Sequence, residues 1–172
     1  MTRILGAVLA GGRSSRFGSD KALALWQGRP LLDWAIDAIA PHVETVIVCG
    51  REDGLPDRPA GGLGPLAGLN AALHFARARG FDAVLSLACD TPVVDRDLLE
   101  RLCRADGAAY VEDGPVIGLW PADRADALDE LLVGQDRSMR AWIARIGATP
   151  IPFDGRIANI NRPEDLAALR IR

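Results

Sequence analysis

The hydrophobic positions in the first half of the chain follow two alternating patterns. Three short, uninterrupted apolar runs each have the length of a strand that is buried on both faces. They cover residues 4–10, 45–49 and 83–88. Between these runs the apolar residues recur at helical spacing, and proline or glycine bounds the helical segments. The alternation predicts an α/β fold in which a largely parallel sheet carries helices on both faces.

The helical segments are predicted by their ends as well as by their faces. The first ends near Pro41, and the second begins at Pro65, which suits a first helical turn, and stops at Gly80. The third follows Asp95, whose side chain can cap a helix. The apolar faces consist of Leu32, Ala35, Ile36 and Ile39 in the first segment, Leu66, Leu69, Leu73 and Ala76 in the second, and Leu98 and Leu102 in the third.

The second half of the chain is less regular. Two predicted strands flank Asp113-Gly114, a typical hairpin turn, so the sheet should include an antiparallel portion. Pro163 is predicted to open a last helix, with acidic residues in its first turn. The other segments are strands at 108–111, 116–120 and 149–152, the last at an edge, and helices at 125–133 and 138–146. No internal repeat or composition break marks a second domain, so we expect one domain over residues 1–172.

Composition and charge narrow the classes of function. The 172 residues include 20 Lys and Arg against 23 Asp and Glu, a net charge of −3, which disfavours a basic domain that binds nucleic acid through its phosphates. An odd number of cysteines, three, fits a reducing cytoplasm better than a disulfide framework. No apolar stretch reaches the ~18 residues of a membrane span. We therefore expect a cytoplasmic protein with neither nucleic acid nor membrane as a partner.

The loop after the first predicted strand has the composition of a phosphate-binding segment. Gly11 and Gly12 let the backbone turn sharply and approach a ligand, and exposed amides there can contact phosphate oxygens. Arg13, Arg16 and Lys21 place three cations within nine positions, which suits a triphosphate. The spacing matches neither the P-loop nor the dinucleotide-binding fingerprint. By itself, the loop is equally compatible with a solvated turn.

Two further features lie where ligands bind in such sheets, at the carboxyl ends of strands. Asp90, in the segment Cys89-Asp90-Thr91-Pro92, can hold Mg²⁺ together with phosphate oxygens, or can merely cap a turn. The glycine-rich segment before Pro65 brings flexible backbone to a helix N-terminus, which suits either polar ligand contacts or close packing.

Together these segments resemble the molybdenum cofactor guanylyltransferase family of nucleotidyltransferases. The resemblance covers residues 5–169 and is strong only for the set as a whole, because the first motif is shared by many sugar nucleotidyltransferases. It implies a three-layer, Rossmann-like nucleotidyltransferase fold, with a mostly parallel sheet and an antiparallel hairpin or edge. The motifs are Leu9-Ala10-Gly11-Gly12 with Arg16-Phe17-Gly18 and Asp20-Lys21, then Gly64-Pro65-Leu66-Ala67-Gly68, Cys89-Asp90-Thr91-Pro92, and Asn159-Ile160-Asn161-Arg162-Pro163-Glu164-Asp165-Leu166.

The resemblance implies a reaction in which GMP passes from GTP to the terminal phosphate of molybdopterin-bound molybdenum (Mo-molybdopterin), with release of pyrophosphate. Lys21, Arg16 and Asp90 would be catalytic, and Asp90 would hold Mg²⁺, with Mn²⁺ as an alternative. The nucleotide-binding residues would be Leu9, Ala10, Gly11, Gly12, Arg13, Lys21, Asp57, Pro65, Leu66 and Asp90.

The same resemblance assigns an acceptor side. Asn159 and Asn161 match paired asparagines of the family, although Asn161 could equally order the start of the last helix. Arg137 and Arg140 match a basic segment that would meet the pterin phosphate, or are simply solvated. The implied partners are GTP, Mo-molybdopterin and molybdopterin-synthesis or molybdoenzyme-chaperone proteins, and we expect a monomer.

Some positions depart from the family pattern. Cys49 stands where the family often has asparagine, which puts one contact to the base or ribose in doubt. Arg162 replaces the usual threonine before Pro163 and is a poorer helix cap.

Two alternatives stay open. The first is a molybdopterin cytidylyltransferase or a sugar-1-phosphate nucleotidyltransferase of the same fold, but glycine at position 11 resembles the guanylyl type, whereas cytidylyl relatives usually have alanine there. The second is a nucleotide-binding module without transfer activity, which the presence of both Lys21 and Asp90 disfavours.

Overall fold

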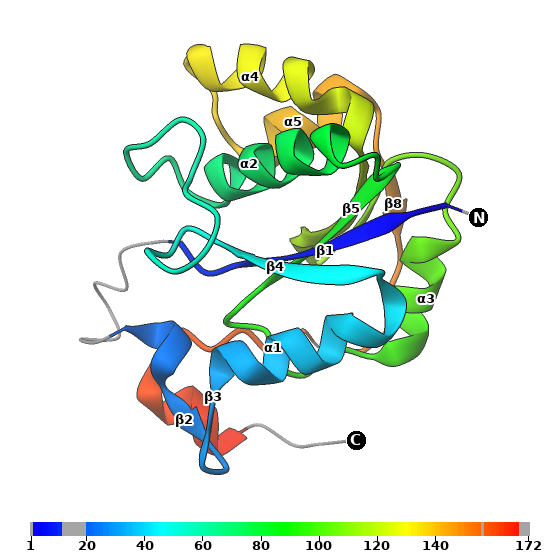
Figure 1. Cartoon of the computed structure of the whole chain (residues 1–172). Helices are drawn as coiled ribbons and strands as arrows, with labels where there is room; N and C mark the ends of the chain where they lie inside the picture. Colours follow the sequence, from blue (N-terminus) through cyan, green and yellow to red (C-terminus); the bar gives the residue numbers. More distant parts are fainter. Residues whose placement is uncertain (1, 12–19, 156, 169–172) are drawn as a thin grey trace.

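The computed structural model describes residues 2–11, 20–155 and 157–168 (Figure 1). In these residues six strands form one sheet in the order β4-β1-β5-β7-β6-β8. The strands are β1 (Ile4–Leu9), β4 (Thr45–Cys49), β5 (Ala83–Ala88), β6 (Ala109–Val111), β7 (Gly114–Pro121) and β8 (Thr149–Ile151). β1 pairs in parallel with β4 and β5, β7 runs antiparallel to β5 and β6, and β8 is parallel to β6. The predicted mixed α/β sheet with an antiparallel hairpin is confirmed.

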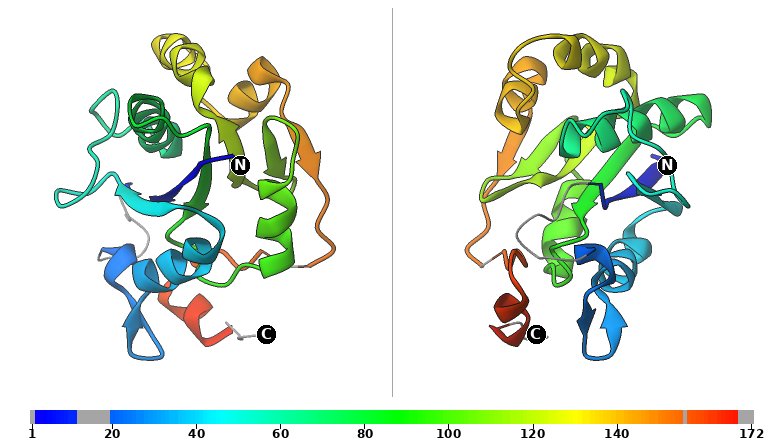
Figure 2. Two further views of the ribbon diagram at one scale, coloured as in Figure 1. Left: turned by 45° about the vertical axis from the view of Figure 1, so that its right-hand side comes forward. Right: turned by 90° about the vertical axis from the view of Figure 1, so that its left-hand side faces the viewer.

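Helices cover both faces of the sheet (Figure 2). One layer contains α1 (Leu31–Ile39) and α3 (Arg96–Cys103), and the other contains α2 (Pro65–Ala78), α4 (Ala125–Val133) and α5 (Met139–Ile146). Short 3₁₀ helices are found at η1 (Lys21–Leu23), η2 (Ala40–His42), η3 (Ala122–Arg124) and η4 (Pro163–Ala168). In the described part of the chain, no helix is long and apolar enough to cross a membrane.

β1 shows why the central strands are uninterrupted apolar runs. Leu5, Ala7 and Leu9 pack in the core under α2 and α4, whereas Ile4 and Val8 pack in the core on the α1 and α3 side. Successive side chains of a strand point to opposite faces, so a strand between two helical layers must be apolar at every position. Each large side chain buried in this way contributes about 1.5–3 kcal/mol of transfer free energy.

The observed ends of several elements follow the predicted local signals. α2 begins at Pro65, and Gly80 beyond its end has a φ of +72°. The Asp95 side chain accepts hydrogen bonds from the backbone N–H groups of Asp97 and Leu98, which caps α3 as predicted. The edge position of β8 beside β6 is also confirmed.

The structure differs from the prediction at two places. A small antiparallel hairpin of β2 (Leu25–Trp26) and β3 (Arg29–Pro30) was not predicted, because two-residue strands carry no periodic signal. Its turn residues, Gln27 and Gly28, have φ angles of 50° and 78°, as tight hairpin turns require. The last helix is the 3₁₀ helix η4 and not an α-helix.

Candidate active site

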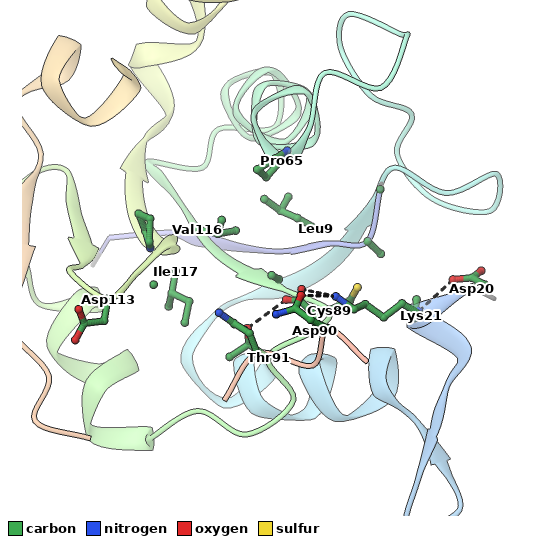
Figure 3. A pocket seen from close by; sticks show the side chains of 18 residues that line it. Leu9, Asp20, Lys21, Pro65, Cys89, Asp90, Thr91, Asp113, Val116 and Ile117 are labelled. Atoms are coloured by element: carbon green, nitrogen blue, oxygen red, sulfur yellow. Dashed lines mark hydrogen bonds and ion pairs between the residues drawn. The ribbon is translucent and has the colours of Figure 1, made fainter. Parts of the chain in front are cut away.

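A pocket of about 360 Å³ lies at the carboxyl ends of β1 and β5 (Figure 3). The start of the antiparallel strand β7 reaches the same edge, so residues 113–117 form a third wall. Leu9 and Pro65 line the apolar side, opposite the polar group formed by Lys21, Asp90 and Thr91. Asn159 and Asn161 complete the polar side. The topology thus brings six segments that are separated in sequence to one cavity.

The Lys21 side chain makes the central polar contact. Its Nζ lies 2.9 Å from Asp90 Oδ2 and 3.2 Å from Asn161 Oδ1. Both members of the ion pair are largely withdrawn from solvent, with side-chain exposures of 16% for Lys21 and 25% for Asp90. Lys21 opens the 3₁₀ helix η1, which is capped by Asp20 through a hydrogen bond from the backbone N–H of Ala22. The cation is therefore held by a capped turn and not by a free loop.

The segment around residue 160 is docked on Asp90 from the other side. The backbone N–H of Ile160 donates to the carbonyl of Asp90 at 2.8 Å, and Ile160 is buried. Next to it, the Thr91 hydroxyl donates to Asn159 Oδ1 at 2.9 Å. These contacts anchor both asparagines beside the carboxylate at the end of β5.

The side chain that orders the start of the last helix is that of Asp165 and not that of Asn161. Asp165 Oδ2 accepts hydrogen bonds from the backbone N–H groups of Asn161 and Arg162, each at 2.8 Å, and these bonds lower the pKa of Asp165. Asp165 therefore orders the start of η4, which offsets the poor capping ability of Arg162. The side chain of Asn161 is directed to Lys21 instead.

Behind Gly11, which lines the pocket, glycines surround the carboxylate of Asp57. A Cβ atom on Gly11 would lie 3.3 Å from Asp57 Oδ2 and 3.1 Å from Gly50 Cα, and one on Gly68 would lie 3.4 Å from Asp57 Oδ1. Burial raises the pKa of Asp57. No described residue donates a hydrogen bond to this carboxylate, which lies behind Gly11 and not on the pocket wall. It is an acceptor that lacks a described donor.

The thiols near the site are structural. Burial raises the pKa of both Cys49 and Cys89 to about 12, so both stay protonated at neutral pH and are poor nucleophiles. Cys49 is fully buried in the core beneath Leu9 and α2. It fills space at the position where family members often carry asparagine.

One cation near the pocket was missed in the sequence. Arg51, two residues beyond the end of β4, donates to Asp20 Oδ2 at 2.8 Å and has a side-chain exposure of only 18%. Asp20 lines the pocket and caps the turn that carries Lys21. The position of Arg51 near the carboxyl end of a strand could have indicated a site residue. The sequence does not show, however, that Arg51 pairs with Asp20.

The other predicted site residues are distributed as follows. Gly12, Arg13 and Arg16 lie outside the described residues. Leu66 is buried beneath the pocket and does not line it, whereas Leu9, Ala10, Gly11 and Pro65 do. Arg137 and Arg140 are exposed and do not line the pocket, and the Arg137 side chain donates to the carbonyl of Gly134.

The donors on the polar side suit a hard divalent cation. Asp90 offers a carboxylate, and Asn159 and Asn161 offer amide oxygens beside Thr91 and Lys21. Mg²⁺ and Mn²⁺ prefer such oxygen ligands, and the protonated thiol of Cys89 does not compete. The residues present therefore fit a divalent metal.

A mostly parallel α/β sheet whose carboxyl edge holds an apolar slot beside a lysine–carboxylate pair is the arrangement expected of the nucleotidyltransferase class. The solved structures agree with this class. Molybdopterin-guanine dinucleotide biosynthesis protein A from Archaeoglobus fulgidus superimposes with a TM-score of 0.76 at 25% identity, over 95% of each chain. The fold of Rv0371C from Mycobacterium tuberculosis H37Rv, solved as a complex with manganese, is also similar, with a TM-score of 0.64 at 19% identity over 97% of each chain.

The chain belongs to the MobA-like NTP transferase domain family, whose sequence model matches residues 6–149. Its relatives include the molybdenum cofactor guanylyltransferase of Rhodobacter capsulatus, which is 39% identical over 96% of this chain and 94% of the relative. The molybdenum cofactor guanylyltransferase of Ectopseudomonas mendocina (strain ymp) is 35% identical over 94% of this chain and 89% of the relative. The recognition made from the sequence motifs is confirmed.

Proposed function

We propose that the protein transfers GMP from GTP to the terminal phosphate of Mo-molybdopterin, which yields the guanine dinucleotide cofactor and pyrophosphate. The names of the relatives support this assignment. The observation in the structure that carries it is the contact of Lys21 with Asp90 and Asn161 on one side of a pocket whose opposite side is apolar at Leu9 and Pro65.

In the proposed reaction, an oxygen of the pterin phosphate attacks the α-phosphorus of GTP. A new P–O bond forms, the bond from the α-phosphorus to the oxygen that bridges to the β-phosphorus breaks, and pyrophosphate leaves. Such transfer depends on positioning and on stabilisation of charge more than on covalent help from the protein. Lys21 would donate to the triphosphate and stabilise the leaving pyrophosphate, assisted by Arg16 and by the amides at Gly11, Gly12 and Arg13.

In this proposal Asp90 would hold the Mg²⁺ ion, or Mn²⁺ in its place, with the side-chain oxygens of Asn159 and Asn161 nearby. Such an ion neutralises charge on phosphate oxygens when it is bound. Asn161 orients the Lys21 ammonium toward the phosphates, and Thr91 holds Asn159 in place through its hydroxyl.

The base would occupy the other end of the pocket. Leu9, Ala10, Gly11, Pro65 and the underlying Leu66 would pack about the nucleoside. The Asp57 carboxylate beyond Gly11 has no described donor, and guanine offers two adjacent donors, N1–H and the 2-amino group. A carboxylate accepts such a pair of hydrogen bonds well.

The acceptor would enter beside the start of β7 and the two asparagines. Arg137 and Arg140 would contact its phosphate only where the acceptor extends beyond the pocket walls. We further propose a cytoplasmic monomer that contacts molybdopterin-synthesis or molybdoenzyme-chaperone proteins.

A nucleotide panel tests this proposal. The purified protein is titrated with GTP, CTP, ATP and UTP in the presence of Mg²⁺, and pyrophosphate release is then measured with and without Mo-molybdopterin. We expect the tightest binding for GTP and pyrophosphate release only with the acceptor. Tighter binding of CTP would contradict the guanylyl assignment, and tight binding of GTP without transfer would indicate a binding module.

A further inference from the structure

A polar network joins α2, α4 and the loop of residues 51–64 on the side of the pocket away from Lys21. Asn70 on α2 and Asp129 on α4 both contact Arg58 in that loop, and we refer to Asn70, Asp129 and Arg58 as the loop clamp. Arg58 directly follows Asp57 in the sequence. Whatever fixes the backbone of Arg58 therefore also fixes the residue whose carboxylate lies behind Gly11.

The loop clamp holds both the backbone and the side chain of Arg58. Asn70 Nδ2 donates to the carbonyl of Arg58 at 3.1 Å and to Asp129 Oδ1 at 2.7 Å. The Arg58 guanidinium contacts the same carboxylate at 3.3 and 3.4 Å. The backbone N–H of Arg58 also donates to the carbonyl of Ala67, in the first turn of α2. The segment beside Asp57 is thus attached to α2 at two backbone groups.

Asparagine at position 70 is expected to reduce the stability of the fold. It is fully buried on a helix face whose neighbours are leucine, alanine and glycine, and its Oδ1 has no hydrogen-bond partner among the described residues. A buried amide with an unsatisfied acceptor costs stability, and alanine would leave no such atom. The advantage of asparagine must therefore lie in the two contacts of its Nδ2.

The network is not a metal site of its own. His74, Asp126 and Asp129 place ligand atoms within 4.8 Å of one another. However, Arg77 contacts Asp126 at 2.8 Å, and Arg58 contacts Asp129. Burial would raise the pKa of Asp129, but hydrogen bonds from Asn70, Arg58 and His74 lower it overall. The charge of the Asp129 carboxylate is therefore already balanced by Arg58 of the loop, with His74 of α2 beside it.

We infer that Asn70 and Asp129 are positioning residues for nucleobase selection, which hold the Asp57 carboxylate in place through Arg58. This inference rests on the proposed function, in which Asp57 accepts hydrogen bonds from guanine. Loosening the clamp should weaken GTP binding and reduce the preference for GTP over ITP, which lacks the 2-amino group. The turnover of bound GTP should change little, because Lys21 and Asp90 lie at the other end of the pocket.

The test compares GTP and ITP. Their Kd values are measured by calorimetry, and KM and kcat are measured with the acceptor, for Asn70→Ala, Asp129→Asn, Arg58→Met and Asp57→Asn. Asp57→Asn should lower the GTP preference roughly 10- to 150-fold, the range for one hydrogen bond to a charged group, because ITP keeps N1–H and lacks only the 2-amino donor. Each clamp variant should lower it about five-fold, with kcat within two-fold of wild type. Asn70→Ala should add little to Asp57→Asn, since both act on one contact.

The matched control is Asp126→Asn. It breaks the Arg77–Asp126 ion pair between the same two helices without touching the loop, so it should leave the GTP preference unchanged. Arg58→Met alters an exposed side chain and keeps the test valid if the buried variant does not fold. Clamp variants that lower the melting temperature but keep the wild-type GTP to ITP ratio would overturn the inference, as would a wild type that binds both equally. Intact GTP selectivity without transfer would instead contradict only the proposed function.

Discussion

Two regions at the pocket differ in whether their charged side chains already have partners. At the end proposed to hold the phosphates, Lys21 and Asp90 already form an ion pair, joined by Asn161. Behind Gly11, beside the region proposed to hold the base, Asp57 is a partly buried carboxylate surrounded by glycine backbone, without a described donor. Lys21 and Asp90 balance each other's charge before a ligand arrives. The Asp57 carboxyl has no such partner among the described residues, and burial disfavours its ionised form.

This difference predicts that one group of residues holds the phosphates of the nucleotide and another group selects its base. Phosphates at the first end can replace the carboxylate as the partner of Lys21, so the contacts made there depend on charge and not on which base the nucleotide carries. A donor pair at the second end relieves a desolvated carboxylate, and a ligand without such donors leaves it unpaired. Sites that must hydrogen-bond a polar group reject analogues that lack it by large factors. The predictions below test whether the two ends respond separately.

The largest effect is expected at the phosphate end. Lys21→Ala and Asp90→Asn should each reduce the rate of pyrophosphate release at least ~10²-fold, because each removes an electrostatic contact to the reacting phosphates. The GTP to ITP ratio should stay near that of wild type. Asp37→Asn, which breaks the exposed Arg29–Asp37 pair, is the control for a lost ion pair. Unchanged turnover in both site variants would refute the assignment of these residues.

At the base end, Gly11→Ala should weaken GTP binding about ten-fold, the lower range for one added carbon in a binding pocket. The new Cβ would lie 3.1 Å from Gly50 Cα and 3.3 Å from Asp57 Oδ2, so backbone or carboxylate must shift. Binding of CTP should weaken less, which titration of both nucleotides would measure. An unchanged GTP to CTP ratio would show that Gly11 does not separate the two bases.

A smaller effect is expected from removing the contact between Arg51 and Asp20, which stabilises the turn that carries Lys21. Arg51→Met removes the 2.8 Å contact to Asp20, which caps the turn that begins with Lys21. We expect kcat/KM for GTP to fall about two- to five-fold, as for a partly exposed ion pair. Asp53→Asn is the control, because Asp53 is 89% exposed and lies 3.7 Å from Arg51. Equal effects of the two substitutions would argue against a specific role for Asp20.

The smallest effect concerns stability and pH. Burial raises the pKa of Asp57, so between its unfolded and folded pKa values the folded state binds more protons than the unfolded state. Stability from this group therefore falls as the pH rises through that window. Asp57→Asn should raise the melting temperature at pH 7, and the gain should vanish well below about pH 4. A variant that is less stable than wild type at pH 7 would contradict this picture.

The sequence predicted the parts of the fold that depend on local periodicity. The strands Thr45–Cys49 and Ala83–Ala88 agree with the predicted limits because each is a short, largely apolar run that directly follows an acidic residue. The hairpin of β2 and β3 was missed because its strands are too short for any period. η4 was predicted as a helix, but neither Pro163 nor the acidic first turn distinguishes an α-helix from a 3₁₀ helix.

The candidate site was only partly predictable from sequence. Lys21 and Asp90 stand out in local motifs, and the topology brings them together as expected. Asn70 could have been noticed as a polar residue on an apolar helix face, four positions after Leu66. Its partners Arg58 and Asp129 are 12 and 59 positions away, and nothing in the local pattern pairs them. Contacts of this kind depend on how helices pack, which periodicity alone does not determine.

The docking of Ile160 on Asp90 has a consequence for the order of events during synthesis. Asn161 is added to the chain 140 residues after Lys21, and Asn159 is added 68 residues after Thr91. A ribosome that has completed β8 has therefore produced every strand of the described sheet, but not the asparagines of the pocket. The polar side of the pocket is therefore completed by the part of the chain that follows every strand of the described sheet, and a chain that ends before residue 159 would have the strands without these two asparagines.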